Sequence, residues 1–225
     1  MKKITAVLMA LLMVVCLFAG CGPETAPENT GDNTAEDVIR IGVFEPASGD
    51  SGAGGKKEML GMQYANSETP TVEIGGKTYK VELVYADNGS DQSKAPAAAS
   101  ELVGKNVAIV LGSYGSGVSI AAGDTFKAAG VPAIGVTCTN PQVTSECDVY
   151  FRICFLDPFQ GTVLANFAKD NGATKAYCLS KQGDDYSGGL VNFFSEAFGK
   201  DNCVMETFPE GTSDFSVYIT NAQNQ

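Results

Sequence analysis

The 225-residue sequence contains no histidine and no tryptophan. Without histidine, Ser-His-Asp and Cys-His catalytic pairs are excluded, and the commonest protein ligand of transition metals is missing. Positive charge is scarce too, because 15 Lys and Arg residues stand against 26 Asp and Glu residues and give a net charge of −11. Nucleic-acid binding depends on clustered Lys and Arg, so this balance argues against a nucleic-acid partner.

The N-terminal segment predicts export followed by lipid attachment. Two lysines precede an apolar run over residues 4–18, which is short for a membrane span and typical of a secretory signal. Ala19 and Gly20 then lead into Cys21, and this segment resembles a bacterial lipobox, whose cysteine becomes the lipidated N-terminus. We predict a signal peptide over residues 1–20 and a lipidated Cys21 that anchors the protein outside the cytoplasm on the bacterial cell membrane. An ordinary signal peptide, or an uncleaved anchor with an incidental cysteine, is the alternative.

The segment after Cys21 predicts a flexible tether. Residues 22–37 read GPETAPENTGDNTAED, which is polar, acidic and rich in Pro, Thr and Asn. No apolar residue in it is large enough to pack against a core, so we assign residues 21–37 to the lipidated cysteine and its tether. A lipid, a tether and a globular body suit a protein that works just outside a membrane.

The cysteines beyond Cys21 do not have the spacing of a metal site. They are Cys138, Cys147, Cys154, Cys178 and Cys203. No pair is separated as in a zinc site and no histidine can complete one, so we expect no metal. Export permits disulfides, and Cys138 with Cys147 would close a short loop. Small apolar core residues are the other interpretation for Cys154 and Cys178, which lie in strand-like runs.

From residue 38 onward, short apolar runs alternate with longer helical stretches in a chain whose 44% hydrophobic content suffices for a core. Such alternation predicts right-handed βαβ units and hence a parallel sheet flanked by helices, the α/β class. The expected strands are residues 38–44, 71–74, 77–86, 107–112, 132–136, 150–155, 175–179 and 203–208. The expected helices are residues 56–68, 90–105, 116–129, 158–171 and 187–198, with a last one beginning at 215.

Ligands of such sheets bind outside the carboxyl ends of the strands, where loops lead into helices. The corresponding segments, all rich in Gly, Ser and Thr, are residues 46–55, 113–119, 137–144 and 180–188. A helix opening at Ser116 presents free amides and a partial positive charge to a carboxylate. Ser116 and Thr139, from neighbouring loops, would hold such a group without an arginine. The alternative is that Ser116 only caps its own helix.

Several motifs in a fixed order resemble one family. Phe151-Arg152, Asp157 and Gln160-Gly161 form the most specific pattern, F-R-x(4)-D-x(2)-Q-G. Residues 112–119, 137–144 (TCTNPQVT) and 183–189 (GDDYSGG) continue the likeness. The chain from about residue 38 onward resembles the leucine/isoleucine/valine-binding family of type I periplasmic binding proteins. That resemblance implies a first α/β lobe over residues 38–155 and a partial second lobe over residues 156–225.

The resemblance also implies a function and a set of binding residues. In this family two lobes close on a small amino acid or related carboxylate solute and deliver it to the permease subunits of an ABC importer, without catalysis and without a cofactor. Ser116 and Thr139 match positions that hold the ligand carboxylate, and the Thr137 carbonyl matches one that meets the ligand amine. Cys138 lies between them and is expected in the same site. Tyr186 matches a position of the second lobe that faces the cleft.

Two departures concern the ligand. Gly54 stands where amino-acid binders of the family often place a tyrosine against the ligand, which leaves the side-chain pocket undefined. The acidic residue that grips the ligand ammonium comes from a later part of the second lobe, beyond Gln225. We therefore expect a second lobe that is truncated at its C-terminus, closes poorly and exposes an apolar patch.

The sequence also allows three other interpretations of the protein's function. A nucleotide-dependent enzyme is disfavoured, because the glycines at 52, 54 and 55 are followed by Lys57 where the dinucleotide fingerprint needs glycine, and Asp87 lies too far along. A sensory ligand-binding receptor module on the same fold, or a non-functional gene fragment, stays open.

Overall fold

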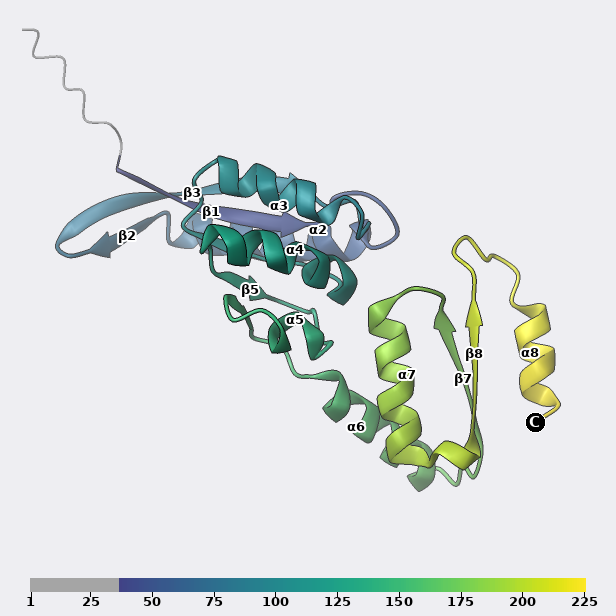
Figure 1. Ribbon diagram of the computed structural model, residues 1–225. Coiled ribbons are helices and arrows are strands. Elements are labelled where there is room, and N and C mark those ends of the chain that lie inside the picture. The colour runs from purple at the N-terminus through teal and green to yellow at the C-terminus, as the bar shows by residue number, and fades with distance from the viewer. Residues whose placement is uncertain (1–36) are drawn as a thin grey trace, which may run out of the picture. The chain divides into compact units, whose positions relative to one another are not determined.

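The computed structural model describes residues 37–225 (Figure 1). The predicted signal peptide, Cys21 and nearly all of the tether lie outside the described residues. Within residues 37–225 no helix is long and apolar enough to cross a membrane.

The larger sheet has six strands in the order β2-β3-β1-β4-β5-β6. All neighbouring strands are parallel except β2, which forms an antiparallel hairpin with β3. The α/β class with a mostly parallel sheet is thus confirmed. The strands are β1 Val38–Glu45, β2 Thr71–Ile74, β3 Lys77–Asp87, β4 Ile109–Leu111, β5 Ala133–Gly135 and β6 Tyr150–Arg152.

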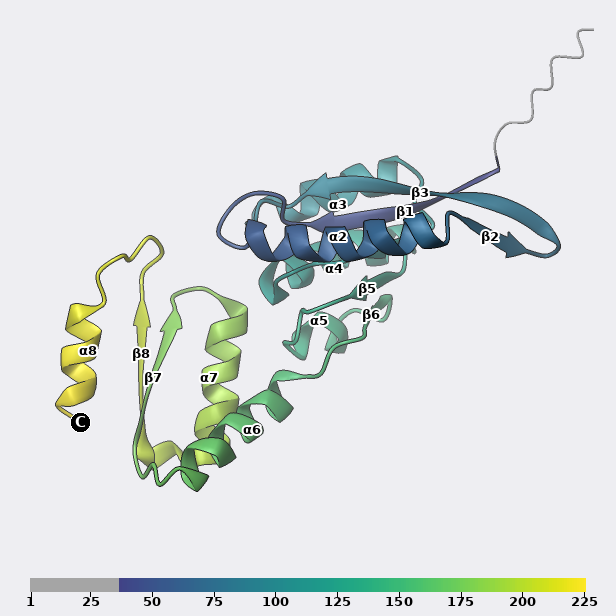
Figure 2. The same cartoon turned by 180° about the vertical axis from the view of Figure 1, so that it is seen from behind.

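Helices cover both faces of this sheet, which explains its nearly continuous apolar strands. The helices are α2 Gly52–Glu68, α3 Ala95–Gly104, α4 Ser116–Ala129 and the short α5 Gln142–Ser145. Helices α3 and α4 lie in front of β1 in Figure 1, whereas α2 lies on the opposite face, turned to the viewer in Figure 2. The core contains Phe44 and Phe126 in an edge-to-face contact with ring centroids 5.5 Å apart.

A second, two-stranded parallel sheet follows, made of β7 Ala176–Lys181 and β8 Cys203–Phe208. Residues 153–156 lead from β6 into the helix that precedes this sheet, so the first sheet ends before the predicted lobe boundary at residue 155 and the second begins after it. Its helices are α6 Asp157–Asp170, α7 Asp185–Phe198, the 3-10 turn η1 Lys200–Asn202 and α8 Ser216–Gln223.

One predicted helix starts later than expected. Helix α3 begins at Ala95, not at residue 90, because polar side chains before it bond to the backbone in turns. The Ser90 amide donates to Asn88 Oδ1 at 3.1 Å and the Ser93 amide donates to Asp91 Oδ1 at 2.8 Å. Such bonds compete with helix formation, and Pro96 is tolerated only in the first turn. The sequence analysis also missed α5.

The disulfide between Cys138 and Cys147, which the sequence left open, is not formed. All five cysteines in the described part of the chain are free. Cys138, Cys147 and Cys178 are buried, whereas Cys154 and Cys203 are half-buried. The interpretation as a small apolar residue therefore fits Cys178 better than Cys154.

Large apolar side chains are exposed along β6, the connection and α6. They are Phe151, Ile153, Phe155, Leu156, Phe159, Val163, Leu164 and Phe167, and we call them the β6–α6 apolar surface. Phe159 and Phe167 are 63% and 67% exposed, and with Val163 they follow the i, i+4, i+8 spacing of one helix face. The expected exposure of apolar groups is thus found on this segment.

Replacing both Phe159 and Phe167 by serine should lower the fluorescence of a hydrophobic dye bound to the folded protein. The free energy of unfolding should change by no more than about 0.5 kcal/mol for each substitution, because the rings are mostly in solvent. Tyr64→Ser on α2, where the ring is 68% exposed, is the matched control and should lower dye binding much less. Equal dye binding by the double variant and the wild type would show that this surface does not attract apolar molecules.

Candidate functional site

The candidate site lies at the carboxyl ends of the parallel strands. Ser116 is the first residue of α4, after the loop from β4, and Thr137, Cys138 and Thr139 follow β5. Tyr186 is the second residue of α7, after β7. The parallel arrangement therefore brings the loops after β4 and β5 to one edge of the first sheet, as the sequence predicted.

Ser116 does not cap its own helix. The N-cap position of α4 is Gly115, whose φ of 126° suits only glycine, and no side chain caps there. The Ser116 side chain instead crosses to the next loop, where its Oγ accepts a hydrogen bond from the Asn140 amide at 3.1 Å. Ser116 is only 2% exposed. The hydroxyl thus joins the loops after β4 and β5 and keeps its own proton available for donation.

Thr139 lies against the buried carboxyl of Asp157. Thr139 is 5% exposed, and its Oγ1 is buried without a hydrogen-bond partner among the described residues. Its carbonyl accepts from the Asp157 amide at 3.0 Å. Burial raises the pKa of Asp157, while the nearby Thr139 hydroxyl and the Arg152 guanidinium oppose that rise. Asp157 belongs to the F-R-x(4)-D motif, so this motif residue packs directly behind the predicted site.

Thr137 is exposed and bonds to an acidic side chain. Its Oγ1 donates to Glu58 Oε1 of α2 at 2.5 Å. Glu45, at the end of β1, is 1% exposed and accepts from the Tyr114 amide at 2.7 Å. Burial, reinforced by the adjacent Glu58 carboxyl, raises the pKa of Glu45 to about 10. Glu45 Oε1 and Glu58 Oε2 are buried without a hydrogen-bond partner in the described chain, and the raised pKa keeps the Glu45 carboxyl protonated at neutral pH.

An aromatic ring covers the position of Gly54. A Cβ atom there would lie 2.5 Å from the Tyr114 ring, so any larger residue at position 54 would require the ring to move. Gly54 and Glu58 are four residues apart and share one face of α2. The Tyr114 ring therefore lies over the same face of α2 that carries the Glu58 side chain. The sequence analysis missed Glu45, Glu58 and Tyr114, although the i, i+4 spacing of Gly54 and Glu58 was a usable signal.

The Cys138 side chain faces the core. It is fully buried, its Sγ lies 2.1 Å from where a Cβ of Gly135 would be, and burial raises the pKa of its thiol to about 11. Its carbonyl accepts from Arg152 Nη1 at 2.9 Å. Only the backbone of Cys138 is therefore near the candidate site, and its carbonyl is already bonded to Arg152.

Arg152 holds the loop after β5 in place. Besides the Cys138 carbonyl, its Nη1 donates to the Asn140 carbonyl at 2.9 Å, and its Nη2 donates to the Pro141 carbonyl at 3.3 Å and to Thr144 Oγ1 at 2.7 Å. A planar guanidinium can satisfy several acceptors in fixed directions. This one side chain therefore sets the path of residues 138–144.

Tyr186 and its neighbours connect to the first sheet's loops. The Tyr186 hydroxyl accepts from Gln160 Nε2 of α6 at 3.0 Å, and the side chain is 36% exposed. The preceding residue, Asp185, accepts through its carbonyl from Asn140 Nδ2 at 2.8 Å and through Oδ2 from Gln92 Nε2 at 3.1 Å. The sequence predicted none of these contacts of Asn140, Gln92 and Asp185.

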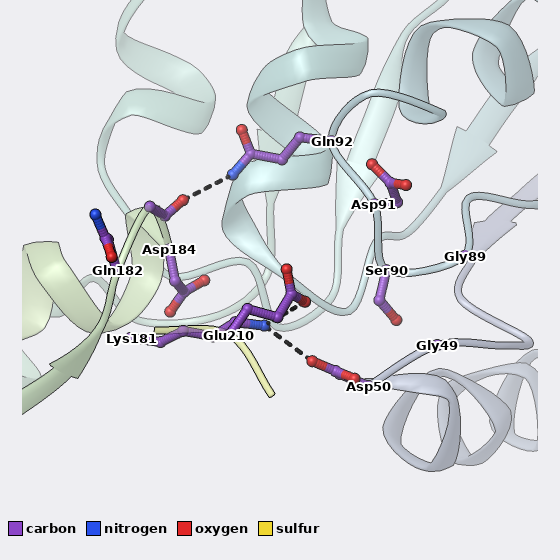
Figure 3. Close-up of a pocket in the computed structure, with 11 residues that line it drawn as sticks. Gly49, Asp50, Gly89, Ser90, Asp91, Gln92, Lys181, Gln182, Asp184 and Glu210 are labelled. Atoms are coloured by element: carbon purple, nitrogen blue, oxygen red, sulfur yellow. Dashed lines mark hydrogen bonds and ion pairs between the residues drawn. The ribbon is translucent and has the colours of Figure 1, made fainter. Parts of the chain in front are cut away.

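A polar pocket of about 330 Å³ lies beside these contacts (Figure 3). It is formed by the loops after β1, β3, β7 and β8. Its lining residues are Gly49, Asp50, Gly89, Ser90, Asp91, Gln92, Lys181, Gln182, Gly183, Asp184 and Glu210. None of the five predicted ligand residues lines it. Lys181 Nζ lies between Asp50 Oδ2 at 2.9 Å and Glu210 Oε1 at 3.0 Å, and these carboxylates raise its pKa.

The lining of this pocket has more negative than positive side chains. Four carboxylates (Asp50, Asp91, Asp184 and Glu210) face one ammonium group, and two of them are already paired with it. A pocket with that balance disfavours an anionic group. The chemistry expected of a carboxylate ligand is therefore available at Ser116 and the first turn of α4, not here.

The chain resembles known proteins over most of its described length. A profile of the periplasmic binding protein family matches residues 38–225. Leu/Ile/Val-binding protein homolog 2 of Brucella abortus is 30% identical over 185 residues, which cover 80% of this chain and 50% of that protein. This chain therefore spans about half the length of the curated relatives it matches.

Two solved structures are similar in both fold and sequence. A leucine binding protein LivK from Thermotoga maritima superposes with a TM-score of 0.77 at 34% identity, covering 83% of this chain and 53% of that one. The branched-chain amino acid transporter substrate binding protein LivJ from Streptococcus pneumoniae, in complex with isoleucine, has a TM-score of 0.73 at 29% identity and covers 84% and 54%.

Glu45→Gln should remove a pH dependence of stability. Because the folded-state pKa of Glu45 is raised from 4.5 to about 10, the folded protein binds more protons than the unfolded chain between those values. Glu45 therefore makes stability fall as pH rises, by at most about 1.4 kcal/mol per pH unit. A neutral glutamine keeps the bond from Tyr114 and should flatten the curve, measured by urea unfolding from pH 5 to 9. Glu73→Gln, on the exposed strand β2, should retain the wild-type slope, and a slope unchanged in Glu45→Gln would contradict the raised pKa of Glu45.

Arg152→Lys should destabilise the protein by roughly 1–3 kcal/mol, because one ammonium group cannot reach the acceptors that the guanidinium spans. The only other arginine provides the control. Arg40 forms an exposed ion pair with Glu82 at 3.2 Å, so Arg40→Lys should cost no more than about 0.5 kcal/mol. Urea midpoints at constant m-value measure both changes. Equal costs for the two substitutions would mean that Arg152 does not fix the loop.

Proposed function

Because the chain belongs to the periplasmic binding protein family, we propose that it binds a small amino acid or related carboxylate solute outside the cytoplasm and delivers it to the permease of an ABC importer. Members of this family are solute-binding proteins and not enzymes, as the sequence predicted. The names of the Brucella homologue and of the two solved structures above give leucine, isoleucine or valine as ligands, whereas other solved proteins of the same fold hold 4-hydroxybenzoate or benzoate. Since the chain spans about half of the length of those relatives, the solute it binds and its permease partner are proposed here and not inferred from their names.

The observation that carries the proposal is the environment of Ser116. Its hydroxyl lies at the first turn of a 14-residue helix whose N-cap residue, Gly115, and second residue, Gly117, have no side chains. Unpaired amides and the helix dipole favour negative charge at such an end. The Thr139 hydroxyl on the adjoining loop is buried and has no hydrogen-bond partner within residues 37–225. These two hydroxyls and the helix end form the proposed carboxylate end of the site.

An amino group would bind on the other side of the same loop. The carbonyl of Thr137 is the acceptor that the family resemblance implies, and the Glu58 carboxylate is bonded to the Thr137 hydroxyl. A negative side chain beside an acceptor carbonyl is a favourable environment for an ammonium group. Tyr114, 39% exposed above Gly54, supplies an aromatic face where the family often has a tyrosine on α2. We propose that Tyr114 contacts the solute in its place.

The membrane part of the proposal rests on the sequence. Lipidated Cys21 and a tether over residues 21–37 would keep the binding lobes close to the permease. Two acyl chains on one cysteine hold a protein to a membrane stably, where a single chain does not. Tyr186 completes the proposed site from the second lobe.

Thermal unfolding of residues 22–225 against amino acids and small carboxylates tests this function. A bound solute at a hundred times its dissociation constant should stabilise the protein by about 2.7 kcal/mol and raise the melting temperature. The shift should disappear in Ser116→Ala combined with Thr139→Ala. Ser100→Ala with Thr162→Ala removes two exposed helix hydroxyls and is the matched control. A cooperative melt that no compound of the panel shifts would contradict the proposal.

A further inference from the structure

The contact between Gln92 and Asp185 lies directly on the first turn of α4. Gln92 Nε2 donates to Asp185 Oδ2 at 3.1 Å and to the Gly183 carbonyl at 3.4 Å. A Cβ on Gly117 would lie 2.3 Å from Gln92 Nε2 and 3.1 Å from Asp185 Oδ2. The glycine at position 117 therefore makes room for this pair. In Figure 3 the Gln92 amide points across the pocket at the segment that carries Gln182 and Asp184.

The backbone of Asp185 is held at the same place. Its carbonyl accepts from Asn140 Nδ2 at 2.8 Å, and the Asn140 amide donates to Ser116 Oγ at 3.1 Å. Asp185 is thereby connected, through its side chain and its backbone, to the two loops that carry the proposed carboxylate site. Gln92 and Asp185 are 93 residues apart in the sequence.

The position of the Asp185 carboxylate matches the charge of the helix end. In a helix each Cα–Cβ bond tilts toward the N-terminus, so an oxygen near the Cβ position of Gly117 lies on the N-terminal side of α4. The partial positive charge there attracts a carboxylate. A solute carboxylate bound at Ser116 would need the region that the Asp185 carboxylate occupies. Two carboxylates side by side repel each other, so both cannot remain there.

We propose that Asp185, held by Gln92, occupies the carboxylate end of the solute site in the ligand-free protein, and that a binding solute displaces it. This inference rests on the proposed function. The Gln92–Asp185 contact stabilises a ligand-free state in which the loops of the two sheets are already joined. The cost of breaking this contact is included in the free energy of solute binding. The apparent affinity is therefore the intrinsic affinity multiplied by the fraction of molecules in which the contact is open.

Amide hydrogen exchange of the ligand-free protein tests the contact itself. Asp185→Ala and Gln92→Ala each remove one partner of the contact. Because Gln92 lies outside α7, an effect that both variants share cannot come from local damage to that helix. Both should speed exchange of the amides of residues 116–119 roughly two- to ten-fold, the factor that corresponds to losing one hydrogen bond. Asp201→Ala removes an exposed carboxylate after the same helix and should leave these rates unchanged. Equal rates in all four proteins would overturn the proposal.

Calorimetric titration with L-leucine, L-isoleucine and sodium acetate tests the competition. Both variants should bind a probe that the wild type binds, with a dissociation constant roughly two- to ten-fold lower. Weaker binding by both variants would make Asp185 part of the solute site and overturn the displacement. If no probe binds any of the proteins, the proposed function fails and the displacement fails with it. Faster exchange in the same variants would then show that the contact exists without that role.

Discussion

The hydrogen bonds of Arg152 are the interaction on which the site depends. Residues 138–144 form a loop with carbonyl groups that need donors, and the guanidinium supplies them to Cys138, Asn140 and Pro141. Once the loop is fixed, the Asn140 amide reaches Ser116 and its side chain reaches Asp185. One cation at the end of β6 thus determines how the loops after β4, β5 and β7 meet.

Electrostatics give the two ends of the proposed site opposite characters. The first turn of α4 is electropositive and holds hydroxyl groups, whereas the end of β1 and the face of α2 carry the Glu45–Glu58 pair. The raised pKa keeps the Glu45 carboxyl neutral at neutral pH, in a buried place where two negative charges side by side would repel strongly. A zwitterionic amino acid has the matching distribution, with its carboxylate and its ammonium a few bonds apart.

Local sequence signals predicted the fold better than the site. Strand β8 and helix α4 have the bounds that periodicity and the stop at Gly130 predicted. The rule for parallel sheets predicted that Ser116 and Thr139 follow the carboxyl ends of neighbouring strands, and they lie after β4 and β5. The burial of the Cys138 side chain in the core was not predicted, because a small residue inside a polar loop gives no sign of which way it points. The partners Gln92 and Asp185 could not be predicted, because their contact joins segments 93 residues apart and depends on how the sheets meet.

The β7–β8 ribbon has a further consequence. Within residues 37–225 it is a separate two-stranded parallel sheet, so neither outer edge pairs with a further strand. Each edge presents a row of backbone donors and acceptors, and two strands alone are marginally stable in water. The outer edges of the ribbon are therefore where a further extended segment would gain backbone hydrogen bonds by pairing as a third strand.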